Sequence, residues 1–285
     1  MKPTEQLSVI TDEIGQDIEN ILPTLKQYEI KAVELRNVWG KNIINFSDEE
    51  LAKLKELLDQ HGIRVSSIAG PLFKCHAPWL PTHKAGTGRF STDVEASRKA
   101  LPRAIEIIKR MGAYRTRVFG YLGLPKVSDE HWRVLIDDIT RFVDMAKQDK
   151  IEIVVENEAF SLVSTWKNTL RILSDIKDPY FKLLLDPGNY FMAGEIHPVE
   201  YYDEVVPRVG HHHVKDGAGA LLWKHYVVVG EGKLDYPAYF EYWTRKCFNG
   251  YYSLETHIHK NRRAQSYVCL DKMHAMLQKC NDLQK

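Results

Sequence analysis

Short apolar runs alternate with amphipathic stretches along most of this chain. The run at 151–158 (IEIVVENE) is rich in Ile and Val and ends abruptly in carboxylates and an amide. Such a run is typical of a buried parallel strand, whose successive side chains point to opposite faces. Glu156 therefore lies on the face opposite to Ile153 and Val155. A carboxylate at the tip of a buried strand is costly to desolvate unless a cation meets it.

The same pattern predicts eight strands separated by helices. The strands are expected at 8–13, 32–36, 64–70, 115–119, 151–158, 181–186, 211–215 and 251–255. Apolar positions at helical spacing predict the helices between them. These are expected after Asp17, from Ser47 to Gly62, and at about 93–111, 128–147, 166–176, 197–206, 236–246 and 263–283.

Eight strands alternating with helices in 285 residues predict an α/β fold, a (β/α)8 TIM barrel that forms a single domain over residues 1–285. An open doubly wound sheet shows the same alternation but seldom needs eight repeats. No glycine fingerprint of a dinucleotide site follows the first strand, and the turn at 230–233 lacks the spacing of a phosphate loop. The loop at 71–91 is long enough that we expect it to be functional or disordered.

Composition and charge exclude several classes of protein. The 39 Lys and Arg residues nearly balance the 38 Asp and Glu residues, so there is no basic field for a nucleic acid. No apolar run approaches the ~20 residues of a membrane span, and the amino terminus lacks an apolar signal core. The four cysteines have no paired spacing and are expected to be free thiols. We therefore expect a cytoplasmic protein without a membrane partner, and homo-oligomerisation stays open.

Glu156 is one of several polar residues that lie at the ends of the last four predicted strands and point to the same side of the barrel wall. One side-chain parity of a barrel faces the interior and the other packs on the helices. By this parity the last inward residues of the late strands are Glu156, Asp186, His213 and Glu255. All four fall at the carboxyl-terminal mouth, where barrel enzymes place their chemistry. The alternative interpretation is four unrelated strand ends.

Three carboxylates packed together without a cation would raise one another's pKa by like-charge repulsion. A divalent ion removes that conflict. Three oxygen donors and one nitrogen donor suit Mn²⁺, Mg²⁺ or Co²⁺, and Zn²⁺ is also compatible. The sequence therefore predicts one divalent metal ion held by Glu156, Asp186, His213 and Glu255.

Three cationic side chains are candidates for substrate binding. Lys215 lies inward two residues beyond the predicted histidine ligand and could polarise a substrate oxygen; the alternative is an ion pair at the rim with Asp216 or Glu231. Arg36, at the tip of the second strand, could contact a substrate hydroxyl, carboxylate or phosphate. Its alternative partner is the neighbouring inward residue, Glu34. Lys74 lies on the long loop, from which it could cover the site; the alternative is a solvated loop residue.

Six segments carry a resemblance to a known family. They are VVENE, LLDPGNYF, HHHVKD and SLETH, which contain the four predicted ligands, together with TDEIGQD and VELRNVWG near the amino terminus. Over nearly its whole length the chain resembles the xylose isomerase-like TIM barrel family, in particular its sugar phosphate isomerase/epimerase branch. That family holds sugar isomerases and epimerases, inosose dehydratase-like lyases and DNA repair enzymes of the endonuclease IV type.

The resemblance implies a divalent-metal-dependent isomerase or epimerase that acts on a sugar, keto-sugar or sugar phosphate through an enediolate. It implies that Glu156 and Glu255 are metal ligands and also the acid/base groups on opposite faces of the substrate. One removes a proton from the carbon next to a carbonyl, and the other returns it. Asp186 and His213 would be ligands only. The implied partner is a small carbohydrate.

The chain departs from particular branches of that family. Ketose 3-epimerases carry a substrate-binding histidine three residues after the aspartate ligand, where this chain has Asn189, and an arginine six residues after the histidine ligand, where it has Gly219. Asn189 is expected to bind substrate, but which sugar stays open. The Asp-x-His pair of the DNA repair branch is missing. A lyase or dehydratase on a keto-sugar or inosose-like substrate is the alternative function, followed by a non-catalytic sugar-binding barrel.

Overall fold

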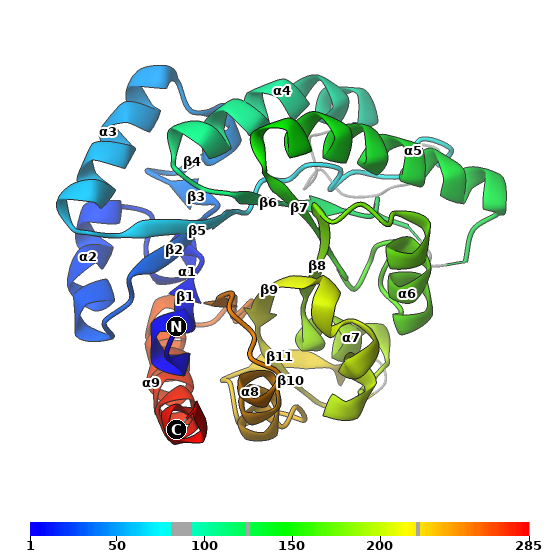
Figure 1. The fold of residues 1–285 in the computed structure, drawn as a ribbon. Helices are drawn as coiled ribbons and strands as arrows, with labels where there is room; N and C mark the ends of the chain where they lie inside the picture. The colour runs from blue at the N-terminus through cyan, green and yellow to red at the C-terminus, as the bar shows by residue number, and fades with distance from the viewer. Residues whose placement is uncertain (81–92, 124–125, 221–222, 285) are drawn as a thin grey trace.

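Eight parallel strands form a nearly closed barrel, with helices around it, in the computed structural model of the protein (Figure 1). The structure describes residues 1–80, 93–123, 126–220 and 223–284. The strands are β1 (Leu7–Val9), β2 (Ala32–Leu35), β5 (Arg64–Ile68), β6 (Arg115–Phe119), β7 (Glu152–Glu156), β8 (Phe181–Leu185), β9 (Val209–Val214) and β12 (Tyr252–Leu254). Their hydrogen-bonded order is β1-β12-β9-β8-β7-β6-β5-β2. A single parallel bridge between Ile10 and Glu34 brings the two edge strands together.

The predicted barrel is therefore confirmed, and all eight strands lie where the apolar runs placed them. Six of the strands are shorter than predicted, whereas β6 has the predicted bounds and β9 runs from Val209 to Val214 where 211–215 was predicted. The first strand stops at Val9, because the polar segment that follows forms a helical turn, α1 (Thr11–Ile14). Asp186, Lys215 and Glu255 lie just past the ends of their strands. These polar residues therefore stand at the mouth of the barrel, where the backbone leaves the sheet.

Most of the predicted helices are present. They are α2 (Ile18–Gln27), α3 (Asp48–Gln60), α4 (Val94–Arg110), α5 (Asp129–Ala146), α6 (Trp166–Asp175), α8 (Tyr236–Arg245) and α9 (Arg262–Cys280). Helix α3 begins as its sequence predicts, because the Ser47 hydroxyl accepts the Glu50 N–H and the Glu50 carboxylate accepts the Ser47 N–H.

The short helix predicted at 197–206 is present only in part and not as an α-helix. That segment forms two 3-10 helices, Val199–Glu204 and Val206–Arg208. Pro198 caps the first, and Pro207 inside the second has no N–H to donate to an α-helix. A short helix that was not predicted, α7 (Pro187–Ala193), instead starts directly after β8.

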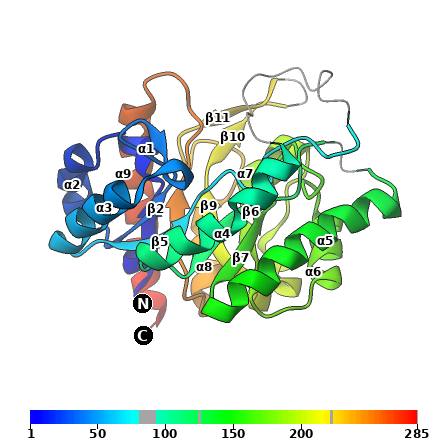
Figure 2. The ribbon, with the colours of Figure 1, turned by 90° about the horizontal axis from the view of Figure 1, so that it is seen from above.

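Two small hairpins also escaped prediction: β3 (Asn37–Val38) with β4 (Lys41–Asn42), and β10 (Asp216–Ala218) with β11 (His225–Val227). The buried Asp216 carboxylate organises the second, since it accepts N–H groups from four residues of the segment, namely Gly217, Gly230, Gly232 and Leu234. Figure 2 shows this hairpin at the end of the barrel opposite to both termini. It therefore borders the mouth. The long loop after β5 is described only to residue 80, and the rest of the predicted 71–91 segment lies outside the described residues.

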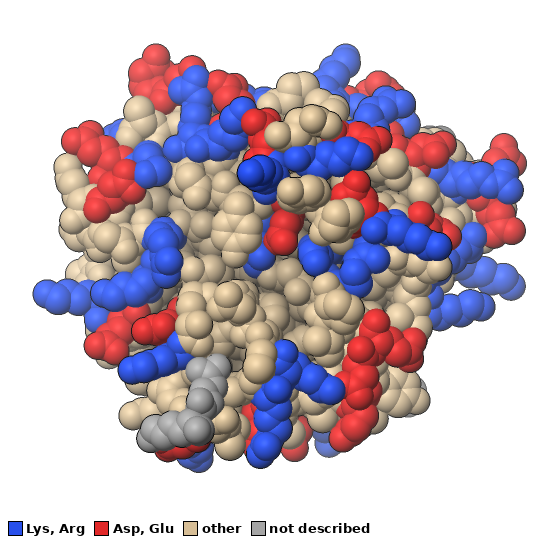
Figure 3. All heavy atoms as spheres, in the orientation of Figure 1, with Lys and Arg blue, Asp and Glu red and all other residues tan. Residues whose placement is uncertain are grey.

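The surface carries no large field of one charge on the face that Figure 3 shows, where Lys and Arg side chains are interspersed with Asp and Glu. No helix in the described ranges is long and apolar enough to cross a membrane. The described cysteines are all unpaired, as predicted, and Cys75, Cys269 and Cys280 are buried. The unusual charges of this protein lie inside the barrel.

Candidate metal centre and active site

The four predicted ligands come together at the carboxyl-terminal mouth of the barrel. One potential ligand atom from each lies within 4.8 Å of the others in the buried group Glu156, Asp186, His213 and Glu255. The His213 Nδ1 atom lies 3.3 Å from Glu156 Oε1 and 3.2 Å from Glu255 Oε2. The structure thus places these side chains as the strand parity required, and their roles as ligands stay predictions.

Asp186 is held in place by its backbone. The Asn157 side chain accepts the Asp186 N–H and donates to the Asp186 carbonyl, both at 2.8 Å. Asp186 also caps α7, because its Oδ1 atom accepts the N–H of Asn189 at 3.0 Å. The other carboxylate oxygen, Oδ2, is buried and makes no hydrogen bond among the described residues, but it lies 2.8 Å from the Lys215 ammonium. Three buried carboxylates and an imidazole grouped in this way offer a donor set that fits a divalent ion.

Lys215 lies among the same carboxylates. Its ammonium is 2.6 Å from Glu255 Oε2, 2.8 Å from Asp186 Oδ2 and 3.9 Å from Glu156 Oε1. Of these contacts, only the one to Glu255 has hydrogen-bond geometry. Lys215 points inward as predicted and does not form the alternative rim ion pair, because Asp216 accepts backbone N–H groups instead. The lysine and a divalent ion would therefore bind the same oxygens.

Arg36 also contacts the cluster, and it does not pair with Glu34, the alternative partner that the sequence suggested. Its guanidinium binds Glu255 Oε1 at 2.5 Å, Glu13 at 2.6 Å and Asp12 at 3.0 Å. The Glu34 carboxylate instead contacts His211 and His213 inside the barrel. Arg36 joins segments that follow β1, β2 and β12, so it holds the closing edges of the barrel together. Removing one partner from such a buried pair typically costs ~3–5 kcal/mol.

Arg117 is a member of the site that the sequence analysis missed. Its guanidinium lies 3.0 Å from Glu156 Oε2 and donates to the Ala69 carbonyl at 3.0 Å. The same parity rule, applied to β6, would have placed Arg117 inside the barrel. The Asn189 amide donates to the other oxygen of Glu156 at 2.9 Å, so this predicted substrate-binding residue contacts a candidate ligand.

These charges decide the protonation of the cluster. Burial is the largest single effect on Glu156 and would raise its pKa, but Arg117 and His213 together outweigh burial and hold this pKa below its usual range. Burial likewise opposes ionisation of Glu255, and Lys215, His257 and His213 together hold its pKa well below the usual range. Burial raises the pKa of Asp186 to about 7, because Lys215 offsets burial only in part. The two glutamates are thus ionised, as both a ligand and a proton acceptor must be.

Lys74 lies farther from the cluster. Its ammonium contacts Glu158 Oε2 at 2.8 Å and lies 4.5 Å from the centre of the Phe119 ring. Glu158 follows β7 by two residues, so Lys74 stands at the rim above Glu156. This position agrees with a residue that covers the site, and substrate contact stays a prediction.

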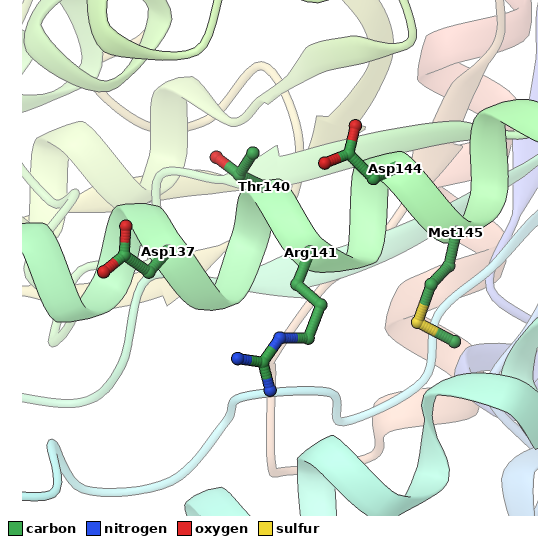
Figure 4. Close-up of a pocket in the computed structure, with 5 residues that line it drawn as sticks. All are labelled: Asp137, Thr140, Arg141, Asp144 and Met145. Atoms are coloured by element: carbon green, nitrogen blue, oxygen red, sulfur yellow. The ribbon is translucent and has the colours of Figure 1, made fainter.

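A hollow of ≈ 440 Å³ on the outside of the barrel contrasts with this cluster (Figure 4). Figure 4 shows that its lining comes from a single helix, α5, through the residues Asp137, Thr140, Arg141, Asp144 and Met145. The charged side chains among them are exposed to solvent. We assign no chemistry to this surface, because solvated charges need no ligand.

Comparison with known proteins agrees with this architecture. Residues 22–273 match the model of the family described as xylose isomerase-like TIM barrel. The chain therefore belongs to the xylose isomerase-like TIM barrel family.

Individual relatives differ in their activities. The chain is 22% identical to an inosose dehydratase of Geobacillus thermodenitrificans over 241 residues, which cover 79% of this chain and 80% of the relative. A 3-keto-D-glucoside 4-epimerase from E. coli has a similar structure, with a TM-score of 0.71, 17% identity and coverage of 96% of this chain and 99% of that one. A magnesium complex of a family member from Mycobacterium smegmatis gives a TM-score of 0.69 at 15% identity, covering 92% of this chain and 88% of that one.

The position of Lys215 predicts that it competes with a divalent ion. Replacing Lys215 by Met removes an ammonium from Glu255 and Asp186, so the affinity for Mn²⁺ should rise by about tenfold, or ~1.4 kcal/mol. Isothermal titration of the purified protein measures this. Lys182→Met is the matched control, because the Lys182 ammonium binds the Pro207 carbonyl away from the cluster. Unchanged or weaker Mn²⁺ binding by Lys215→Met would show that the lysine and the ion do not share oxygens.

Proposed function

We propose that this protein is a divalent-metal-dependent isomerase or epimerase that acts on a sugar, keto-sugar or sugar phosphate. The observation that carries the proposal is the convergence of four buried ligand-type side chains at the mouth of a barrel, next to a lysine that reaches the same point. The family and its sugar-converting relatives support an enzyme of this kind.

The residues that would hold the ion are Glu156, Asp186, His213 and Glu255. Their three carboxylates and one imidazole suit Mn²⁺, Mg²⁺, Co²⁺ or Zn²⁺. The magnesium complex of a related barrel supports a divalent ion, although it does not select one. When bound, the ion would supply a Lewis acid for the carbonyl and the neighbouring hydroxyl oxygen of the substrate.

The two glutamates would move the proton. Each is ionised and is held by an arginine through one carboxylate oxygen: Glu156 Oε2 by Arg117, and Glu255 Oε1 by Arg36. Their other oxygens, Glu156 Oε1 and Glu255 Oε2, face His213 Nδ1. In a two-base reaction one glutamate takes a proton from the carbon next to the carbonyl, leaving an enediolate, and the other returns a proton to the opposite face.

Lys215 would supply a hydrogen-bond donor and a positive charge next to Glu255 and Asp186. If an ion were held by the same carboxylates, the Lys215 ammonium would be free of Glu255 and Asp186 and could donate to a substrate oxygen. A charge-assisted hydrogen bond of this kind contributes ~1.5–3 kcal/mol. Asn189 and Arg36 are proposed to bind substrate from the neighbouring elements, and Lys74 from the rim.

A lyase is the second candidate, and the inosose dehydratase relative favours it. Loss of water from a keto-sugar begins with the same proton abstraction, so the cluster serves either reaction. A non-catalytic sugar-binding barrel is less well supported, because both acid/base glutamates are present and ionised.

The proposal predicts that the purified wild type binds one divalent ion per chain. Asp186→Asn should lose it, since an amide oxygen is a weaker ligand than a carboxylate, while the amide still caps α7. Elemental analysis after incubation with Mn²⁺ and removal of free ion gives the stoichiometry. Asp138→Asn is the control, because the buried Asp138 carboxylate on α5 pairs with Arg98 of α4, outside the barrel and away from the cluster. A wild type without bound metal, or full occupancy in Asp186→Asn, contradicts the site.

The two glutamates give a test of the mechanism. Glutamine keeps an oxygen donor but cannot accept a proton, so Glu156→Gln and Glu255→Gln should each lose ~10²–10⁴-fold in kcat even at saturating Mn²⁺. In an epimerase the two variants should exchange solvent deuterium with opposite epimers of the substrate. Loss of water from the substrate, with product identified by mass spectrometry, would instead support the lyase. Full recovery of both variants in excess Mn²⁺ would make the glutamates ligands and no more.

A further inference from the structure

A fourth carboxylate, Glu34, is buried inside the barrel beneath the candidate metal centre. It lies on β2, its side chain has no exposed surface, and it takes no part in the cluster of four. Burying an isolated carboxylate costs several kcal/mol after relaxation, so its position requires cationic or strongly donating partners. The identity of those partners shows what Glu34 does.

Both partners of Glu34 are histidines of β9. Its Oε2 atom lies 2.9 Å from His211 Nε2 and 3.0 Å from His213 Nε2. The two imidazoles are two residues apart on one strand and therefore face the same side. The other nitrogen of His213, Nδ1, faces Glu156 and Glu255. The His213 ring thus spans the distance between Glu34 and the candidate metal centre.

If an ion binds Nδ1, this geometry leaves the proton of His213 on Nε2, where it faces Glu34. A neutral imidazole that binds an ion through one nitrogen keeps its hydrogen on the other, and a carboxylate at that hydrogen fixes both the tautomer and the ring orientation. We infer that Glu34 is a positioning residue of the metal centre. It accepts a hydrogen bond from the Nε2–H group of His213 and so directs the Nδ1 lone pair towards the ion. The inference rests on the proposed function, because it requires the metal site.

A second ion held by Glu34, His211 and His213 is the competing explanation, since these three residues also offer ligand atoms within 4.8 Å of one another. Glu34 Oε1 and His211 Nδ1 have no hydrogen-bond partner among the described residues. However, His213 would then have to bind one ion through each nitrogen, which requires complete deprotonation of the ring. His211 Nε2 also has an ordinary hydrogen-bond partner in Ser253 Oγ at 2.9 Å. The hydrogen-bonded arrangement therefore explains the contacts without a second ion.

Replacing Glu34 by Gln tests the inference, because glutamine keeps the shape but offers one neutral carbonyl oxygen to two imidazoles. The Kd for Mn²⁺, measured by isothermal titration, should rise by about 10–100-fold while the stoichiometry stays at one. In the Zn²⁺-loaded wild type, nitrogen NMR should show the His213 proton on Nε2 and the metal on Nδ1. In the variant the Nε2 proton should exchange faster with solvent. Glu34→Asp, which keeps the charge but shortens the reach, serves if Glu34→Gln does not fold and should weaken Mn²⁺ binding in the same way.

Glu152→Gln is the matched control, because Glu152 lies at the opposite end of β7 from Glu156. Its carboxylate pairs with the Arg115 guanidinium at 2.7 Å and does not touch the cluster. It should leave the Kd unchanged. A wild type that binds one ion and a Glu34→Gln variant with the same Kd would overturn the positioning role and leave the proposed function standing. Two ions in the wild type and one in Glu34→Gln would make Glu34 a ligand, which also overturns the inference. A wild type that binds no ion overturns the metal site and this inference with it.

Discussion

Three carboxylates buried within a few ångströms of one another are the constraint on which the structure depends. At such distances like charges repel strongly in a medium of low dielectric constant, and burial adds a desolvation cost for each. The barrel meets this cost by placing Arg36, Arg117 and Lys215 around the carboxylates. Each comes from a different strand or strand end, so the cluster forms only when the whole barrel is closed.

The cations also explain how the site combines stability with chemistry. Arg36 and Arg117 each hold one oxygen of a glutamate from the side, which leaves the second oxygen directed at His213. Lys215 takes the central place among the carboxylates and can leave it on a flexible side chain. An ion held at the proposed site would therefore replace the charge of Lys215 and leave the two arginines in place. Beneath the cluster, Glu34 stabilises the orientation of the one imidazole.

Strand periodicity predicted the barrel and the four converging side chains, because both depend on local alternation and on which end of a strand a residue occupies. Arg117 obeyed the same rule and was missed because an arginine within a strand gives no local sign of its partner. The Glu34–His213 contact crosses the barrel between residues 179 positions apart, so no spacing in the sequence could reveal it. The helix α7 and the β10–β11 hairpin depend on capping by Asp186 and Asp216, whose hydrogen bonds form only when the mouth is assembled.

The central claim is that the carboxylates at the mouth hold an ion in competition with Lys215. A crystal structure of the protein with Mn²⁺, with the ion located by its anomalous scattering, tests this most directly. We expect one peak bonded to Glu156, Asp186, His213 Nδ1 and Glu255, with the Lys215 ammonium displaced from Asp186. An anomalous peak elsewhere, or Lys215 still bound to both carboxylates in crystals saturated with Mn²⁺, would contradict the claim.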